Sequence, residues 1–247
     1  MDLSSMSKEE VRLLVYKRLR EANVARPPFP IEHRIPNFEG AEQACKRITQ
    51  LPEWRRARVV KINPDSPQRA IRYAALVEGK ILLMPTPRIR NGFLLLDPST
   101  IPGRSYKEAS TIKGAFRYGK PLKTIDALTA WIERVDFIVE GSVAVNTRGD
   151  RLGKGHGYGD LEWGILGELG LVEDNTPVAT TVHDLQVFNS RLPQDPHDVP
   201  VDYIATPTRL IKVNERRNKP SGIIWSILDK EKIEEIPILK ELAEGVL

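Results

Sequence analysis

The chain has 247 residues, 40% of them apolar, and its 37 Lys and Arg against 33 Asp and Glu give a net charge of +4. This composition can bury one substantial core, and no run of about 18 apolar residues is present to span a bilayer, so we expect a soluble protein without a membrane partner. Because the cations are spread along the chain beside anions, the charge does not favour a nucleic-acid partner. The single cysteine, Cys45, excludes an intrachain disulfide and predicts a buried structural thiol.

The N-terminal region has the pattern of a capped helix. Ser7 followed by Glu10 matches a capping box, and apolar residues at helical spacing continue to about Asn23. Lys8 and Arg12 then lie one turn apart on one side of this helix. The region is charged from Lys8 onward and lacks the apolar stretch of a secretory signal, so we expect a cytoplasmic protein.

Prolines between residues 26 and 36 predict an extended crossing segment, not a domain boundary, so we expect one domain over residues 1–247. Beyond this segment, strand-like and helix-like patterns alternate. The predicted strands are 58–62, 81–84, 135–139, 142–145, 178–182, 201–206 and 222–225, and the predicted helices are 40–51, 68–78, 124–134 and 161–169. The alternation predicts an α/β fold with a mostly parallel sheet covered on both faces, and binding loops at the carboxyl ends of its strands.

A glycine-rich stretch, residues 149–160, lies between a predicted strand and a predicted helix. Its glycines let backbone N–H groups approach an anion, while Arg151 and Lys154 supply positive charge. Asp160 is placed to hold the magnesium ion that accompanies ATP, and a helix N-terminus nearby favours phosphate further. The stretch lacks the ending of a P-loop and the spacing of a dinucleotide fingerprint, so a tight structural connection stays open as the alternative.

Two His-Asp pairs, His183-Asp184 and His197-Asp198, adjoin predicted strands. Each pair could act as a general base, bind a metal or fix a loop. Zinc-like ligand spacing and a Gly-x-Ser-x-Gly motif are absent from the sequence. It therefore disfavours zinc and catalytic-triad chemistry and favours a hard cation held by carboxylates.

Three segments resemble signature motifs of the 5-formyltetrahydrofolate cyclo-ligase family: 151–160, 196–202 and the basic helical segment 8–12. Segments 84–90 and 203–209 are most similar to the branch found in archaea and in the methenyltetrahydrofolate synthetase domain-containing proteins of animals. The resemblance covers nearly the whole chain. It implies a three-layer α/β/α fold of the sugar-phosphate isomerase and CoA-transferase type.

The resemblance implies a ring closure that depends on ATP and Mg²⁺. In it, 5-formyltetrahydrofolate becomes 5,10-methenyltetrahydrofolate through a phosphorylated formyl intermediate, with release of ADP and phosphate. Asp160 and Asp202 would hold magnesium, and Tyr158 would flank the reacting folate. Arg151, Tyr158 and Asp160 would serve catalysis. The implied phosphate-binding residues are Lys8, Arg12, Arg151, Gly153, Lys154, Gly155, His156, Gly157, Tyr158 and Gly159. As alternatives, Lys8 and Arg12 could be solvated helix charges, and Tyr158 could simply close the loop over the core.

Two positions depart from the family loop, since His156 stands where lysine is usual and Gly159 stands where a second tyrosine is usual. The acidic substrate-binding segment of the family is also missing after the second strand. In its place, Arg88 and Arg90 are predicted to meet a glutamate tail and Phe93 a pterin ring, so the expected partners are a reduced folate and ATP. The departures keep a second class open, a non-catalytic or altered-specificity nucleotide- or folate-binding module, including an RNA-linked regulatory one. The sequence gives no indication of oligomeric state.

Overall fold

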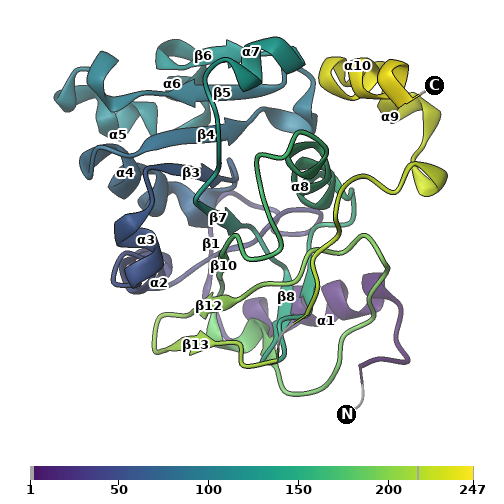
Figure 1. The fold of residues 1–247 in the computed structure, drawn as a ribbon. Coiled ribbons are helices and arrows are strands. Elements are labelled where there is room, and N and C mark those ends of the chain that lie inside the picture. Colours follow the sequence, from purple (N-terminus) through teal and green to yellow (C-terminus); the bar gives the residue numbers. More distant parts are fainter. Residues whose placement is uncertain (1–2, 216, 247) are drawn as a thin grey trace.

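The computed structural model describes residues 3–215 and 217–246, and within them an eight-stranded sheet forms the centre of the fold (Figure 1). Its strand order is β13-β12-β10-β7-β3-β4-β5-β6. The strands are β3 Val59–Ile62, β4 Ile81–Pro85, β5 Phe93–Leu96, β6 Lys120–Leu122, β7 Phe137–Glu140, β10 Val178–Thr181, β12 Tyr203–Ala205 and β13 Leu210–Lys212. The five strands from β12 to β4 are parallel, and the pairs at both edges are antiparallel. The predicted mostly parallel sheet is confirmed.

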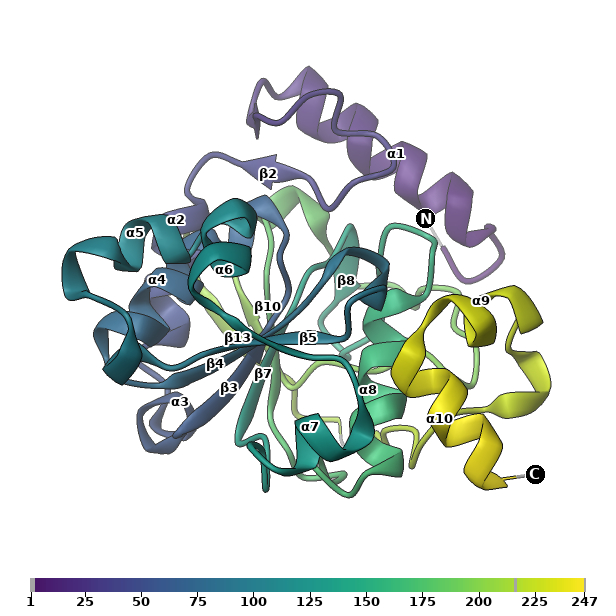
Figure 2. The same cartoon turned by 90° about the horizontal axis from the view of Figure 1, so that it is seen from above.

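Helices cover both faces of this sheet, as Figure 2 shows from above. One face carries α2 Ala41–Ile48, α3 Pro52–Arg56, α4 Arg69–Val77, α5 Tyr106–Ala109 and α6 Ile112–Tyr118. The other face carries α7 Ile125–Thr129, α8 Tyr158–Glu168, α9 Lys230–Glu235 and α10 Pro237–Val246. Side chains alternate along each strand, so Val60 and Ile62 pack toward the first layer. Leu83 and Ile138 pack toward the second. The predicted three-layer α/β/α fold is confirmed.

Helix α1, Lys8–Glu21, lies outside these layers over a small sheet of β8 Ala144–Asn146, β9 Arg151–Leu152 and β11 Val187–Phe188. The predicted capping box is present, with the Ser7 hydroxyl accepting from the Glu10 backbone and the Glu10 carboxylate accepting from the Ser7 backbone. Two short paired strands, β1 Ala25–Arg26 and β2 Asn37–Phe38, bracket the proline-rich crossing segment.

Three expectations are settled by packing. Residues 222–225 were expected to form a strand, which is wrong, because this segment runs beside α8 and leads into a short 3₁₀ helix at Trp225–Ile227. The predicted helix 124–134 is confirmed only over Ile125–Thr129. Cys45 is buried, its thiol donates to the Pro67 carbonyl over 3.4 Å, and burial raises its pKa to about 12, as expected of a structural thiol.

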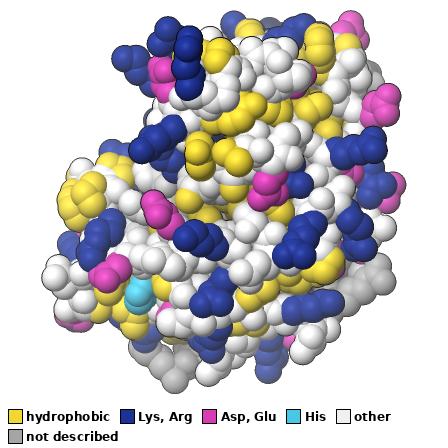
Figure 3. Space-filling model, turned by 90° about the vertical axis from the view of Figure 1, so that its left-hand side faces the viewer, with side chains coloured by type: hydrophobic (Ala, Val, Ile, Leu, Met, Phe, Trp, Pro, Cys, Tyr) yellow, Lys and Arg dark blue, Asp and Glu magenta, His cyan; other side chains and the backbone are white. Residues whose placement is uncertain are grey.

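The surface agrees with the dispersed charge of the sequence. On the face shown in Figure 3, Lys and Arg are scattered among acidic and apolar side chains instead of forming one block. Among residues 3–215 and 217–246, no helix is both long and apolar enough to cross a membrane.

Candidate functional site

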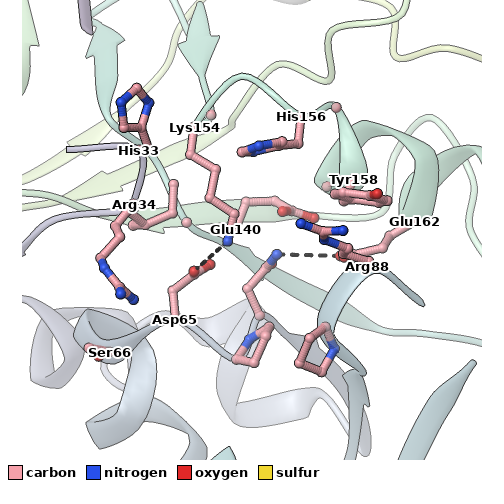
Figure 4. Close-up of a pocket in the computed structure, with 18 of the residues that line it drawn as sticks. His33, Arg34, Asp65, Ser66, Arg88, Glu140, Lys154, His156, Tyr158 and Glu162 are labelled. Carbon is pink, nitrogen blue, oxygen red and sulfur yellow. Dashed lines mark hydrogen bonds and ion pairs between the residues drawn. The ribbon is translucent and has the colours of Figure 1, made fainter. Parts of the chain in front are cut away.

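A cavity of about 480 Å³, here called the main cavity, opens at the carboxyl ends of the central strands (Figure 4). Residues 63–66 follow β3, residues 86–88 follow β4, and Gly141 follows β7. The crossing segment and residues 153–160 supply the remaining walls. The main cavity therefore lies at the carboxyl edge of the parallel sheet, where the alternating pattern predicted the binding loops.

The glycine loop, residues 153–157, connects β9 to α8 and takes a shape that glycine permits. Gly155 and Gly157 have φ values of +99° and +68°, which side-chain-bearing residues rarely adopt. Arg12 supports this loop from α1, because its Nε donates to the Gly153 carbonyl over 2.7 Å. Its guanidinium lies so close that a Cβ added at Gly155 would be 3.2 Å from Nη1. Arg12 is therefore a buried brace of the loop, not a solvated helix charge.

Arg151 is buried beneath the loop and holds Asp160 in place. Its Nη2 lies 2.5 Å from Asp160 Oδ1, while Nη1 donates to the Gly141 carbonyl and Nε to the Val199 carbonyl. Burial alone would lower the pKa of Arg151, but the carboxylates of Asp160 and Glu140 outweigh it and raise that pKa. All three guanidinium nitrogens make a hydrogen bond, so Arg151 positions Asp160, and its predicted phosphate contact stays a prediction.

The structure separates the two predicted magnesium ligands. Asp160 lines the main cavity, and both of its hydrogen bonds, from Arg151 and from the Val199 backbone, use Oδ1. Asp202 precedes β12 at the opposite, amino edge of the sheet, where it accepts from the Val178 backbone and pairs with Lys219 at 3.0 Å. The prediction of a shared Asp160–Asp202 site is therefore wrong. Asp160 fits a magnesium ion by itself, since Mg²⁺ bound with phosphates needs only one or two carboxylates.

Lys8 lies outside the walls of the main cavity. Its Nζ is 2.7 Å from Asp195 and 2.5 Å from Asp198, so its charge is balanced by two carboxylates. Asp195, His197 and Asp198 bring ligand atoms within 4.8 Å of one another, but the Lys8 ammonium already occupies this acidic cluster. The predicted phosphate contact of Lys8 therefore stays a prediction.

His183 has the structural role that was one of its alternatives. Its Nδ1 accepts from the Leu185 backbone over 3.2 Å and caps the 3₁₀ helix Asp184–Gln186. The neighbouring Asp184 carboxylate accepts from the hydroxyls of Thr206 and Thr208. This His-Asp pair fixes a loop and takes no part in the main cavity.

A charged network lies at the floor of the main cavity. Lys61, fully buried on β3, pairs with Glu140 of β7 at 2.6 Å and with Glu162 of α8. Burial alone would lower the pKa of Lys61, but the two carboxylates outweigh it and raise that pKa. Burial also raises the pKa of Glu162 to about 7. The Glu140 Oε2 atom is buried without a hydrogen-bond partner among the described residues.

The three predicted substrate residues separate in the structure. Arg88 lines the main cavity, and its φ of 57° lies in the left-handed region, which non-glycine residues rarely adopt. Arg90 instead pairs with Glu235 of α9 at 3.2 Å. Phe93 is fully buried in the core at the start of β5, so its predicted contact with a pterin ring is wrong. The alternation of side chains along β5 explains this, since Phe93 faces the helical layer that contains α7 and α8.

His156 and Tyr158 project over the main cavity from the glycine loop and the first turn of α8 (Figure 4). Their rings stack with centroids 6.3 Å apart. Lys232 of α9 donates to the His156 carbonyl over 3.2 Å, and its Nζ lies 5.7 Å from the Tyr158 ring centroid. Burial lowers the pKa of His156, as do the positive charges of Lys154, Arg88 and Lys232, so the imidazole is neutral at physiological pH.

Comparisons with known proteins show the family of the chain. The model of the 5-formyltetrahydrofolate cyclo-ligase family matches residues 4–207, which is most of the chain. The chain belongs to this family. Methenyltetrahydrofolate synthase domain-containing proteins of Bos taurus and Homo sapiens are 40% identical over 246 and 244 residues, or 97% and 96% of this chain. The match covers 62% and 61% of their lengths, so the chain spans about three fifths of these relatives.

A solved cyclo-ligase-type structure supports the fold. The 5,10-methenyltetrahydrofolate synthetase of Aquifex aeolicus superposes with a TM-score of 0.52 and 24% identity, covering 87% of this chain and 97% of that one. At 24% identity this similarity supports the fold alone and carries no argument about activity.

The network at the cavity floor accounts for one departure from the family loop. A Cβ added at Gly159 would lie 2.8 Å from Glu140 Oε2, so the Glu140 carboxylate stands where a side chain at position 159 would begin. A tyrosine there would collide with it. Sequence reasoning missed Lys61, Glu140 and Glu162, although a charge inside each of three apolar runs was a usable signal.

Proposed function

We propose that the chain catalyses the ATP- and Mg²⁺-dependent cyclisation of 5-formyltetrahydrofolate to 5,10-methenyltetrahydrofolate, releasing ADP and phosphate. One observation carries this proposal. In a chain of the cyclo-ligase family, a braced glycine loop, the Asp160 carboxylate and the main cavity meet at the carboxyl edge of the sheet. A phosphoryl donor at the loop and a folate in the cavity would then share one wall.

The chemistry requires positioning and charge neutralisation more than a covalent group from the protein. The formyl oxygen is a poor leaving group, so transfer of the γ-phosphoryl group to it creates an iminium phosphate. Attack by the neighbouring N10 nitrogen closes the ring and expels phosphate. Bound with ATP, Mg²⁺ would neutralise the phosphate charge, and the Asp160 Oδ2 atom is the ligand this chain would offer.

Phosphate binding is assigned to the glycine loop and Lys154. Lys154 Nζ lies 3.0 Å from Asp65 in the same cavity, so it can exchange this carboxylate for a phosphate. Gly157 is the N-cap of α8, whose first N–H groups favour an anion. Arg12 would act from below by holding the loop in its anion-binding shape.

Folate binding is assigned to Arg88 and Tyr158. The Arg88 guanidinium suits the carboxylate of a glutamate tail, and the Tyr158 ring suits the flat pterin. Figure 4 shows the two side chains close to each other at the cavity, with Arg88 near Glu162.

The test is formation of the methenyl product, followed by its absorbance, when the protein is mixed with 5-formyltetrahydrofolate, Mg²⁺ and ATP. The proposal expects a rise that requires both ATP and Mg²⁺ and that ADP does not support. A flat trace with measurable ATP binding would instead favour the non-catalytic nucleotide-binding module, for which the supporting observation is His156 in place of the usual lysine of the family loop.

A further inference from the structure

The C-terminal arm, residues 220–246, packs against the glycine loop although it lies outside the 4–207 segment matched by the family model. Figures 1 and 2 both place α9 and α10 beside α8. The arm begins in close contact with α8, because Gly164 and Gly167 leave room for its backbone. A Cβ at Gly167 would lie 2.8 Å from the Ser221 carbonyl. The arm backbone therefore packs directly against α8 at these two glycines.

The arm is fixed at both ends. Near its start, the Pro220 carbonyl accepts from Trp163 Nε1 over 2.7 Å, and the Ile223 backbone donates to Glu168 over 2.9 Å. Near its end, the Glu241 carboxylate accepts from the Ile125 backbone over 2.8 Å. The buried side chains Ile236, Ile238 and Leu239 join the core. Such anchoring gives the stretch between the two ends a defined place next to the loop.

Between these anchors the arm encloses a second recess of about 220 Å³, on the side of α8 and the arm. Its apolar wall consists of Leu161, Ile223, Ile224, Ile227 and Leu228. Its other wall is the glycine loop, and it shares His156, Gly157 and Asp160 with the main cavity. Ile227, at the mouth of this wall, is 56% exposed, so its side chain is accessible from solvent.

We propose that this arm completes the nucleotide site: the apolar recess takes the base of ATP, and Lys232 supplies a phosphate cation that the loop lacks at position 156. The proposal rests on the proposed function. A two-substrate transfer needs its sites on adjoining sides of the reacting phosphate, and the two recesses adjoin at Gly157 and Asp160. The larger cavity suits the folate, and the smaller apolar recess suits a flat heterocycle.

Lys232 is placed for this role. It donates to the His156 carbonyl and lies over the Tyr158 ring, while its nearest carboxylate, Asp229, is 3.8 Å away. That distance leaves the ammonium available to a phosphate at the loop. His156 itself brings no charge to the loop at physiological pH, so the arm compensates within the same recess.

The test compares binding of Mg²⁺-ATP and Mg²⁺-tripolyphosphate to the full chain by calorimetry, without folate. Wild type should bind ATP roughly tenfold or more tightly than tripolyphosphate, because only ATP has a base. Ile227→Asn should remove most of this difference and leave tripolyphosphate binding unchanged. Lys232→Met should weaken both ligands by roughly tenfold, because a phosphate contact is common to both. Lys240→Met, which removes an exposed lysine of the same arm, is the matched control and should change neither.

Equal binding of the two ligands by wild type, or unchanged binding in both Ile227→Asn and Lys232→Met, would overturn the assignment of the arm. In that case, continued formation of the methenyl product would leave the proposed function standing. Failure of wild type to bind ATP or tripolyphosphate at all, together with no product, would remove the proposed function as well.

Discussion

Asp160 is held at the glycine loop by a buried guanidinium that leaves its second oxygen unused by any hydrogen bond among the described residues. The Arg151 pair and the Val199 backbone both use Oδ1. The motif resemblance gave Asp160 and Asp202 the same role, but strand direction separates them by placing Asp202 at the amino edge. Which end of a strand a residue occupies is decided by tertiary pairing, which a motif cannot express.

The substitution Asp160→Asn should lower activity by about 10²-fold or more, because it removes the negative charge offered to Mg²⁺. Asparagine keeps an oxygen for the Val199 N–H group, so the helix start should persist. Asp202→Asn is the matched control and should retain activity. The measurement is the rate of methenyl product formation as Mg²⁺ is titrated; equal losses in the two variants would contradict the placement of the metal.

Arg88 and Arg90 make a second matched pair. Arg88→Ala should raise the KM for 5-formyltetrahydrofolate by about 10-fold, as expected for loss of a charge-assisted contact of about 1.5 kcal/mol. Arg90→Ala should leave that KM unchanged, because Arg90 is committed to Glu235. The KM for ATP should stay the same in both. An unchanged folate KM in Arg88→Ala would remove this residue from the folate site.

At the scale of elements, one ion network joins two strands and a helix. Lys61 of β3 lies between Glu140 of β7 and Glu162 of α8, so this charge network ties the sheet to the helix that carries Tyr158 and Asp160. Buried networks of this kind contribute little net stability when complete, but they are costly to break.

Lys61→Met should lower the free energy of unfolding by about 3–5 kcal/mol near neutral to alkaline pH, since it leaves two buried carboxylates without a cation. The pKa of Glu162 is about 7 in the folded protein, above its ordinary 4.5. Between pH 4.5 and about pH 7, Glu162 keeps its proton in the folded state but has lost it in the unfolded state. The contribution of Glu162 to the free energy of unfolding therefore falls as the pH rises from 4.5 to about 7. The loss in Lys61→Met should therefore be smaller at acidic pH. Urea unfolding of both proteins across this range is the measurement, and a pH-independent difference would contradict it.

Helix α1 offers a simpler test of an element. Ser7→Ala removes one half of the capping box, and should lower the free energy of unfolding by about 0.5–2 kcal/mol. Because α1 carries Arg12, fraying of its first turn should also raise the KM for ATP. Thermal and urea unfolding together with ATP kinetics measure both effects. A loss of stability with no change in ATP kinetics would show that the brace on Gly153 is independent of the cap.

At the scale of the whole molecule, sequence periodicity predicted the layers well, because the spacing of apolar residues within each segment indicates whether that segment is a strand or a helix. The elements around Val59–Ile62, Arg69–Val77 and Val178–Thr181 were predicted closely. The arm was not, since residues 222–225 have the β-branched composition of a strand but pack on glycines of α8. The predicted single domain over residues 1–247 stays a prediction.

Only part of the candidate site could be predicted from the sequence. Local features, such as the glycine loop and its following helix, were readable from residue order. The brace from Arg12, the cavity floor around Lys61 and the cation from Lys232 depend on contacts between segments far apart in the chain. Only the folded structure brings these together.

The central claim is that ATP at the glycine loop activates a folate held in the main cavity. The most direct measurement follows ADP and methenyl product together in one reaction with 5-formyltetrahydrofolate, ATP and Mg²⁺. The account predicts that both appear in equal amounts, and that neither forms when folate or Mg²⁺ is omitted. Steady ADP release without methenyl product, or ATP binding with no turnover at all, would contradict it.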